Sequence, residues 1–347
     1  MIKIITEERE WNAAIQQANH SDFYHTYHYH DLSKKDNENP VLIKYEDDKS
    51  AILLPLLIRD IENTEYKDAT SVYGYSGVLS LTDNSDFDHV NFKHELDNCF
   101  KKNKIVSVFS RLHPYLKHQE NILSNVGRIV NPGNVIYIDL TESLEVQRSY
   151  YSRRLKTYVN KAQSLCSVIK GHTKEHIEIF KELYYDNMRR VNANESYFFE
   201  ERYFYELMDS SDFETDLLLC VYNETQEVIA GGLFIKTGEI VQYHLSGLGG
   251  DKYNLSPVKY LIDNMRVRAK EEGYKVFNLG GGRSNKQDSL YAFKASFSKN
   301  FRPFLLWKYI ADEEVYADLV KKLDEMHMED EDYNKDFFPS YRRLLTK

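Results

Sequence analysis

The chain has 347 residues, of which 42% are hydrophobic and 29% are charged. This length suits two domains that each bury a core, and the composition excludes a chain that is disordered throughout. The formal net charge of −9 gives no general positive field for a phosphate backbone, which disfavours a dedicated DNA-binding protein.

The cysteines and the apolar segments indicate the compartment. Cys99, Cys166 and Cys220 lie far apart, without the paired spacing of a zinc site or a disulfide framework, and this fits a reducing environment. The first residues are charged and differ from a secretory signal, and the longest apolar run, AILLPLLI, is far shorter than the roughly 20 residues that cross a bilayer. We therefore expect a cytoplasmic protein without a membrane span.

The first part of the chain alternates predicted helices and strands. Helices are expected from Glu8 to Asn19, near Tyr29 to Lys35 and from Ser85 to Lys102. Strands are expected at PVLIKYE, AILLPLLIRDI, VSVFSRL and VIYIDL. Together these elements can close one sheet, so the expected class is mixed α/β.

The segment from Thr141 to Ala162 predicts one helix and the domain junction. It has a capping residue, a carboxylate three positions later, and a basic C-terminal half that suits the helix dipole. We place the junction within or just before this helix, which divides the chain into domains 1–148 and 149–311.

The second part predicts strand SVIK, a long helical region from Lys174 to Met208, and consecutive strands DLLLCVYN and VIAGGLFIKT. Strand EIVQYHLSG, helix SPVKYLIDNMRVRAKEEG and strand YKVFNLGGG follow, with Pro257 in the first turn of that helix and Gly273 at its end. Two hairpin strands, a strand, a helix and a strand are the element order of a GNAT acetyltransferase core.

A glycine run provides the main candidate for ligand binding. Gly280, Gly281 and Gly282 follow a predicted buried strand, and Arg283, Asn285 and Lys286 come directly after them. Glycines let a backbone approach a ligand closely, so this loop can hold phosphates or an acyl chain. The alternative is a tight connection without a ligand, because the run matches neither the Walker spacing nor a dinucleotide fingerprint.

Lys294 is the candidate cation of this segment. Leu290, Phe293 and Phe297 surround it on one apolar face. A partly desolvated lysine can stabilise an oxyanion or protonate a leaving oxygen, whereas a lysine that snorkels outward does neither.

Two tyrosine-containing segments add candidates. Strand alternation predicts that Tyr243 and His244 face opposite sides of a sheet, and either can act as a base or an acid, although a core histidine is the commoner outcome. Tyr73 and Tyr75 lie two apart beside glycines, which predicts a shared face that lines a sugar or nucleotide pocket or belongs to an edge strand.

The histidine-rich run FYHTYHYHDL contains His25, His28 and His30. No carboxylate or cysteine completes a recognisable zinc set there, so we expect no metal site.

The chain resembles the FemA/FemB/FemX family over nearly its full length. The matching segments are VYGYSGVLS, FSRLHP, YYSRRLKTYVNKA, LYYDNMRRVNANESYFF, AGGLFI, VQYHLSG and GYKVFNLGGGRSNKQDSLYAFKASFS. The resemblance implies an acyltransferase of two tandem GNAT-like domains, with residues 312–347 packed back on the first. Characterised members transfer amino acids from aminoacyl-tRNA to peptidoglycan precursor peptides. The resemblance to relatives in polysaccharide gene clusters implies acyl-CoA as the acyl donor.

The resemblance also implies residue roles. Lys294 matches the lysine near the acyl-transfer centre, and the loop from Gly280 to Arg283, with Asn285 and Ser289, matches the donor side. The expected acceptor pocket contains Tyr73, Tyr75, Arg111, Arg190 and Tyr197. His113 stands where FemX-like members often carry an aspartate, so imidazole replaces carboxylate as a candidate base.

These observations predict an N-acyltransferase that uses acyl-CoA as a co-substrate and acylates an amino group of a cell-envelope sugar or polysaccharide precursor. The candidate catalytic residues are Lys294, His244, Tyr243 and His113. The alternatives are an aminoacyltransferase that uses aminoacyl-tRNA and a precursor peptide, and a non-catalytic GNAT-like binding module. No permanently bound cofactor is expected.

Overall fold

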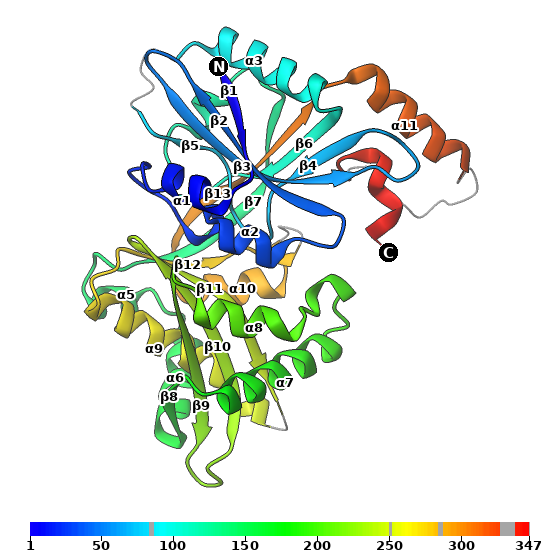
Figure 1. Ribbon diagram of the computed structural model, residues 1–347. Coiled ribbons are helices and arrows are strands. Elements are labelled where there is room, and N and C mark those ends of the chain that lie inside the picture. The colour runs from blue at the N-terminus through cyan, green and yellow to red at the C-terminus, as the bar shows by residue number, and fades with distance from the viewer. Residues whose placement is uncertain (83–86, 250–251, 284–286, 327–336, 347) are drawn as a thin grey trace. The chain divides into compact units, whose positions relative to one another are not determined.

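The chain forms two compact units. The computed structural model describes residues 1–82, 87–249, 252–283, 287–326 and 337–346. The first unit comprises Met1–Pro132 and Phe304–Lys347, and the second comprises Gly133–Pro303. Both units combine a sheet with covering helices (Figure 1), which confirms the predicted mixed α/β class.

The first unit contains a mixed sheet with the strand order β1-β2-β3-β4-β6-β13, and β5 pairs with β3. The strands are β1 (Ile2–Ile5), β2 (Glu38–Glu46), β3 (Ala51–Asp60), β4 (Lys67–Thr70), β5 (Leu79–Ser80), β6 (Ile105–Arg111) and β13 (Asn300–Ile310). The helices are α1 (Glu8–Ile15), α2 (Tyr27–Ser33), α3 (His89–Lys102), α4 (Gln119–Ile122) and α11 (Glu313–Met326).

Helices cover both faces of the β2–β3 hairpin. Leu42 and Leu53 pack in one cluster with Trp11 of α1. Leu54 packs in another cluster, with Leu96 of α3. Because successive strand residues point to opposite faces, two covered faces explain why the AILLPLLI run is continuously apolar.

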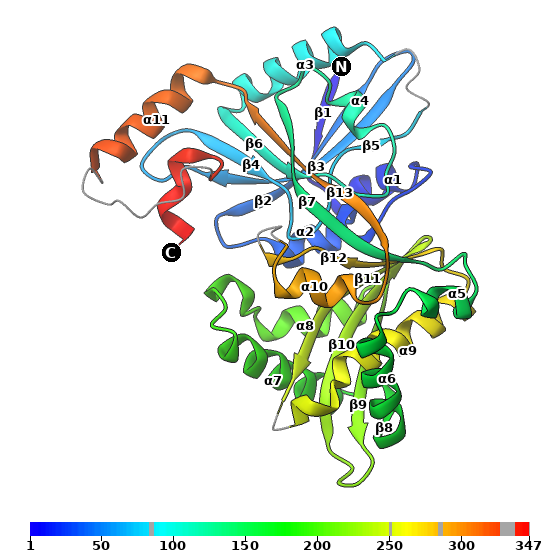
Figure 2. The ribbon, with the colours of Figure 1, turned by 180° about the vertical axis from the view of Figure 1, so that it is seen from behind.

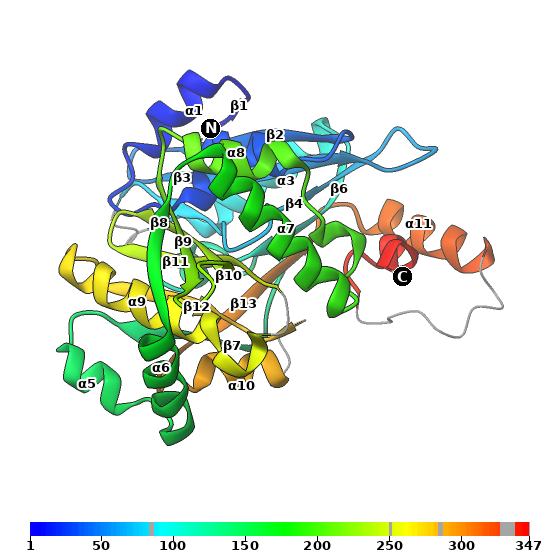
Figure 3. The same ribbon diagram turned by 90° about the horizontal axis from the view of Figure 1, so that it is seen from below.

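The second unit contains a sheet with the strand order β7-β12-β11-β10-β9-β8. The strands are β7 (Arg128–Asp139), β8 (Cys166–Gly171), β9 (Glu214–Tyr222), β10 (Val228–Thr237), β11 (Ile240–Leu248) and β12 (Val276–Gly280). The helices are α5 (Leu144–Ser149), α6 (Arg153–Leu165), α7 (Lys174–Arg190), α8 (Glu201–Asp209), α9 (Pro257–Glu271) and α10 (Ser289–Ala295). Figure 3 shows α7 and α8 on one side of this sheet and α6, α9 and α10 on the other.

Each unit receives one strand from the opposite part of the sequence. β7 follows elements of the first unit, yet its residues Ile136–Asp139 pair with β12. β13 follows α10, yet its residues Leu306–Ile310 pair with β6. The assignment of VIYIDL to the first sheet was therefore wrong, because periodicity identifies a strand but does not identify its hydrogen-bonding partner.

The chain crosses between the units inside these two strands, after Pro132 and after Pro303. The junctions predicted after residues 148 and 311 lie later in the chain. The C-terminal segment belongs to the first unit, where α11 and the segment Ser340–Thr346 lie side by side (Figure 2). Arg342 bonds to the Asp68 carboxylate and to the Asp60 carbonyl, which fastens the segment to the strands.

Two long predicted helices are interrupted. Residues 141–162 contain α5 and most of α6, and Ser152 caps α6 by accepting a hydrogen bond from the Leu155 amide at 3.1 Å. Arg153 and Arg154 therefore lie in the first turn of α6, where the helix dipole disfavours them, in contrast to the predicted arrangement. The region from Lys174 to Met208 is likewise divided, into α7, a short 3₁₀ helix and α8.

Candidate active site

The parallel strands β11 and β12 separate part-way along their length. Their register pairs Ile240 with Val276, Val241 with Phe277 and Gln242 with Asn278. β11 continues to Leu248, and in the described residues it pairs from Tyr243 onward with β10 only. Beyond Gln242, no described strand pairs with the side of β11 that faces β12, and we call this side the open edge of β11.

A buried pair of amide side chains marks the point of separation. Asn278 Nδ2 donates to Gln242 Oε1 at 2.7 Å, and Asn278 Oδ1 accepts from the Gly280 amide at 3.2 Å. Both side chains are about 1% exposed. Because buried amides are costly without partners, this pairing fixes where the two strands part.

Lys294 and the glycine run meet at the end of β12. Lys294 lies in α10, and its Nζ donates to the Gly281 carbonyl at 2.7 Å. The ammonium also lies 5.9 Å from the centre of the Tyr243 ring on β11. Burial lowers the pKa of Lys294 to about 8. The structure therefore brings together Lys294, the glycine run and β11, three features that the sequence singled out separately.

Arg283, directly after the glycines, is bonded to the residue that caps α10. The Arg283 amide donates to Asp288 at 3.1 Å, and the Arg283 guanidinium lies 3.6 Å from the same carboxylate. Asp288 also caps α10 by accepting from the Tyr291 amide at 2.9 Å. Burial raises the pKa of Asp288, but these amide hydrogen bonds outweigh it and the pKa is lowered. Ser289 is exposed, and the predicted donor residue Asn285 lies outside the described residues.

Tyr243 and His244 point to opposite sides of the sheet, as predicted. The register of β10 and β11 shifts at this point, so that Leu233 pairs with Leu245 and Phe234 pairs with Tyr243. Tyr243 faces Lys294 of α10, whereas His244 Nε2 lies 2.8 Å from the Tyr203 hydroxyl of α8, on the other side (Figure 3).

The environments of the two side chains differ. Burial raises the pKa of Tyr243 to about 12, so its hydroxyl, which bonds to Ser246, stays protonated near neutral pH. Sequence reasoning missed Tyr203, the partner of His244. The Tyr203 ring stacks on the Phe199 ring, with 4.2 Å between the ring centres. No motif marks Tyr203, and only the packing of α8 on the sheet reveals it.

Two acceptor candidates lie at the end of α7 and just after it. The Arg190 guanidinium lies 4.4 Å above the Tyr253 ring and bonds to Asn187. Tyr197 is 38% exposed, and its carbonyl accepts from the Tyr184 hydroxyl at 2.7 Å. Both side chains reach the surface of the second unit.

The acceptor candidates of the first unit are arranged differently from the expectation. Residues 71–78 form no strand, so Tyr73 and Tyr75 do not share a strand face. Tyr75 packs against Tyr24 and Phe304 with ring centres 5.7 and 5.6 Å away, whereas Tyr73 is 45% exposed. The Arg111 guanidinium lies 5.1 Å above the Phe109 ring.

His113 belongs to a buried polar cluster of the first unit. Its Nε2 lies 2.9 Å from the Asp22 carboxylate, and its Nδ1 accepts from the Tyr115 amide at 3.3 Å. Gln119 binds the amide and the carbonyl of His113. With 2% exposure and a partner on each ring nitrogen, His113 has the geometry of a structural histidine, and this geometry does not favour a role as a base.

Two further histidines of this unit, His25 and His30, are fully buried. Burial lowers the pKa of His25 to about 4 and that of His30 to about 3, and His25 Nε2 lies 2.6 Å from the Ser76 carbonyl. Within the part of the chain that the structure describes, no group of three or more histidine, cysteine or acidic side chains is placed to hold a metal ion. None of the described helices has both the length and the apolar character required to cross a bilayer.

Two surface hollows lie away from Lys294. One is bordered by Lys170 and by the segment Met208–Thr215, and the other lies beside α11 and Ser340. The candidate site is therefore defined by the separation of β11 and β12 and by the lysine at its end.

No family model and no curated protein match the sequence. Among solved structures, the chain is similar to FemX, with 14% identity, a TM-score of 0.68, and coverage of 91% of this chain and 99% of that one. The chain has a FemX-like fold. It is also similar to L-PGS from Bacillus licheniformis, with 14% identity, a TM-score of 0.59, and coverage of 92% of this chain and 97% of that one.

A third solved structure that is similar to this chain also has two tandem units. A tandem GNAT protein from the clavulanic acid biosynthesis pathway matches with 10% identity, a TM-score of 0.50, and coverage of 90% of this chain and 99% of that one. The predicted fold of two tandem GNAT-like units is therefore confirmed. In the second unit, β9, β10, β11, α9 and β12 follow the predicted core order.

Proposed function

We propose that the second unit catalyses the transfer of an acyl group from an activated carbonyl to an amine. The observation that carries this proposal is the separation of β11 and β12 beyond Gln242 and Asn278, with the Lys294 ammonium at the end of β12. In the proposal, the donor carbonyl lies along the open edge of β11, where backbone N–H groups and Lys294 can stabilise an oxyanion.

The chemistry follows from these groups. The acceptor nitrogen attacks the carbonyl carbon, and the carbon–oxygen π electrons move to the oxygen to form a tetrahedral oxyanion. When the oxyanion collapses, the bond to the leaving sulfur or oxygen breaks, and the leaving atom takes up a proton while the nitrogen loses one. An ammonium has three N–H donors, so Lys294 can bind Gly281 and still donate to the oxyanion or to the leaving atom.

Tyr243 and His244 have different proposed roles. The raised pKa of Tyr243 makes its hydroxyl a hydrogen-bond donor on the Lys294 side of the sheet. His244, bonded to Tyr203, is the candidate proton acceptor on the α8 side. Tyr73, Arg111, Arg190 and Tyr197 remain acceptor-side candidates, whose substitution should raise KM more than it lowers kcat.

The donor in the first form of the proposal is acyl-CoA, and the acceptor is an amino group of a cell-envelope sugar or polysaccharide precursor. This form is supported by the likeness to a tandem GNAT protein and by the sequence resemblance to relatives in polysaccharide gene clusters. The second candidate uses aminoacyl-tRNA and a precursor peptide, and the higher TM-score of FemX favours it.

A donor panel tests the proposal. The full chain is incubated with radiolabelled acetyl-CoA or with radiolabelled aminoacyl-tRNA, each with amino-sugar nucleotides or amine-bearing muropeptides. Product from acetyl-CoA that is insensitive to ribonuclease supports the first form, and product that disappears after ribonuclease treatment of the donor supports the second. Absence of product from both donors with every acceptor would favour a non-catalytic binding module.

A further inference from the structure

A long stretch of the second unit carries positive charge only. Between Glu145 and Glu175 the sequence contains seven lysines and arginines and no aspartate or glutamate. These residues are Arg148, Arg153, Arg154, Lys156, Lys161, Lys170 and Lys174. In a chain with a net charge of −9, this local concentration of cations is a distinct surface feature.

The cations of α6 point outward because the apolar side of the helix is already used. Leu155, Val159 and Ala162 are buried, while Arg153, Arg154 and Lys161 are exposed, and Lys156 is half-buried. The helix packs its apolar side against the unit and presents a polar, positively charged side to its surroundings. Any partner of this side must therefore bind through its charge.

The cations of α6 differ from Arg148 and Lys170, which form ion pairs with Asp263 and with Glu214 and Asp216. In the described residues, no carboxylate lies within ion-pair distance of the four cations of α6. Arg153 and Arg154 also occupy the first turn, and no acidic residue accompanies them there. Cations at a helix N-terminus are unfavourable, so their retention without a counter-ion favours an external anion.

Two cations of this surface, Arg154 and Lys259, lie against the same aromatic ring. The Arg154 guanidinium and the Lys259 ammonium of α9 lie 5.3 and 4.0 Å from the centre of the same ring, that of Tyr158. Burial, and then the charge of Arg154, lower the pKa of Lys259. An anion bound beside Tyr158 would relieve this repulsion between like charges.

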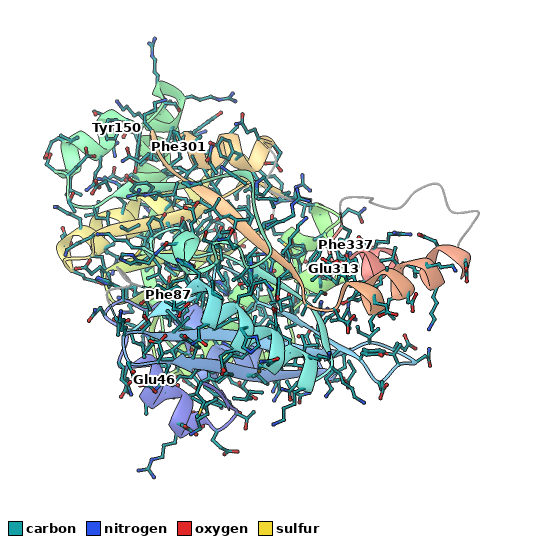
Figure 4. The ribbon with its side chains drawn as sticks, turned by 90° about the horizontal axis from the view of Figure 1, so that it is seen from above. Glu46, Phe87, Tyr150, Phe301, Glu313 and Phe337 are labelled. Atoms are coloured by element: carbon teal, nitrogen blue, oxygen red, sulfur yellow. The ribbon has the colours of Figure 1, made fainter. Side chains whose placement is uncertain are left out.

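Apolar side chains lie next to the same surface. Phe301 is 58% exposed between Lys299 and Arg302, which are also exposed. This segment follows Ser296, whose carbonyl accepts from the amide of Ser152, directly before α6, at 3.0 Å. Figure 4 labels the two side chains Tyr150 and Phe301 of this unit. Val146 of α5 is 40% exposed.

We propose that this cationic face, formed by Arg153, Arg154, Lys156, Lys161, Lys259, Lys299 and Arg302 with Phe301, docks on a membrane surface rich in anionic phospholipid. Lysine and arginine beside exposed apolar side chains suit the boundary between headgroups and acyl chains. RNA would also satisfy the cations, but a duplex offers no apolar partner for Val146 and Phe301. The proposed association is peripheral and does not depend on the proposed activity.

Vesicle binding by the full chain tests the proposal. The probes are vesicles of phosphatidylglycerol and phosphatidylcholine, vesicles of phosphatidylcholine alone, and an RNA duplex. The test variant carries Arg153→Glu, Arg154→Glu and Lys161→Glu. The control carries Lys35→Glu, Lys49→Glu and Lys117→Glu, which changes the net charge equally at exposed sites of the first unit. Acidic residues in the first turn of α6 suit the helix dipole, so the test variant should fold.

We expect the wild type and the control to bind the anionic vesicles, and the test variant to bind them at least tenfold more weakly. Binding should weaken with added salt, and Phe301→Ser should reduce it several-fold without changing the salt dependence. The proposal is overturned if vesicles of both compositions bind equally, if the control loses as much affinity as the test variant, or if only the RNA duplex binds.

Discussion

The two units contain equivalent parallel strand pairs that end differently. In the first unit, β4 and β6 pair from Lys67 to Thr70, and the contact continues because the Ser71 amide donates to the Phe109 carbonyl at 2.9 Å. Ser71 Oγ then accepts from the Arg111 amide at 3.2 Å. In the second unit, pairing between β11 and β12 ends at Gln242 and Asn278.

The difference arises from the residues at each end point. Ser71 extends the closed pair with both its amide and its side chain. Asn278 instead turns its side chain to Gln242 and to the Gly280 amide, which leaves the edge of β11 open. The same order of elements can thus produce a strand pair that stays together or one that separates. We propose that the separated pair of the second unit receives the acyl group.

Removing Lys294 should produce the largest effect. Lys294→Ala should lower kcat/KM for acyl transfer by about 10²–10³-fold, the loss measured when one oxyanion donor is removed. Steady-state kinetics with the donor identified by the panel measure this effect.

Lys299→Ala is the matched control, because Lys299 lies in the same segment and is exposed. Its kcat/KM should stay within about twofold of the wild-type value, since surface changes are usually small. Equal losses in the two variants would remove Lys294 from the proposed site.

A substitution in the closed unit should cost stability and leave the chemistry unchanged. Gly74 has a φ of +123°, and a Cβ at this position would lie 2.0 Å from the Tyr24 ring. Gly74→Ala should lower the free energy of unfolding by about 3 kcal/mol, through backbone strain and overpacking. Denaturant unfolding followed by tryptophan fluorescence measures this, because both tryptophans, Trp11 and Trp307, are buried in the first unit.

Gly273→Ala provides the comparison. Gly273 has a φ of +89°, but a Cβ there would meet no atom within 4 Å, so only the backbone strain of about 1 kcal/mol remains. Equal losses at the two glycines would mean that the contact with Tyr24 is unimportant.

The closed unit should also be sensitive to acid. His25 and His30 have lowered pKa values in the folded state, about 4 and about 3, so the unfolded chain binds more protons below pH 6.5. Stability should be full above pH 6.5 and should fall by about 2 kcal/mol between pH 6.5 and 5.5. Tryptophan-detected unfolding across this range checks the slope, and a flat profile would contradict buried neutral histidines.

The open site should show its own pH dependence. If the Lys294 ammonium is the active form, the rate should fall above about pH 8, where this group loses its proton, by about tenfold per pH unit. Lys294→Arg should be less active than the wild type at pH 7. Its activity should be the same at pH 9, because arginine stays charged. A wild-type rate that rises through pH 8 to 9 would instead indicate a neutral amine acting as a base.

Sequence patterns predicted most elements and the opposite orientation of two candidate side chains. Periodicity identified the β2–β3 hairpin, the order of strands and helix in the second unit, and the opposite orientation of Tyr243 and His244, because these depend on local alternation. The exchange of β7 and β13 could not be found this way, since strand partners are set by long-range hydrogen bonds. The partners of His113 and His244 come from α4, α8 and connecting loops, which no local signal links to them.

A crystal structure with a bound donor analogue tests the central claim most directly. The analogues are an acyl-CoA with a non-hydrolysable thioether and a 3′-aminoacyl nucleotide with a stable amide. The account predicts that the acyl oxygen of one of them lies against the open edge of β11, within hydrogen-bond distance of Lys294 Nζ. An acyl group bound at the β4–β6 pair of the first unit, or away from Lys294, would contradict it.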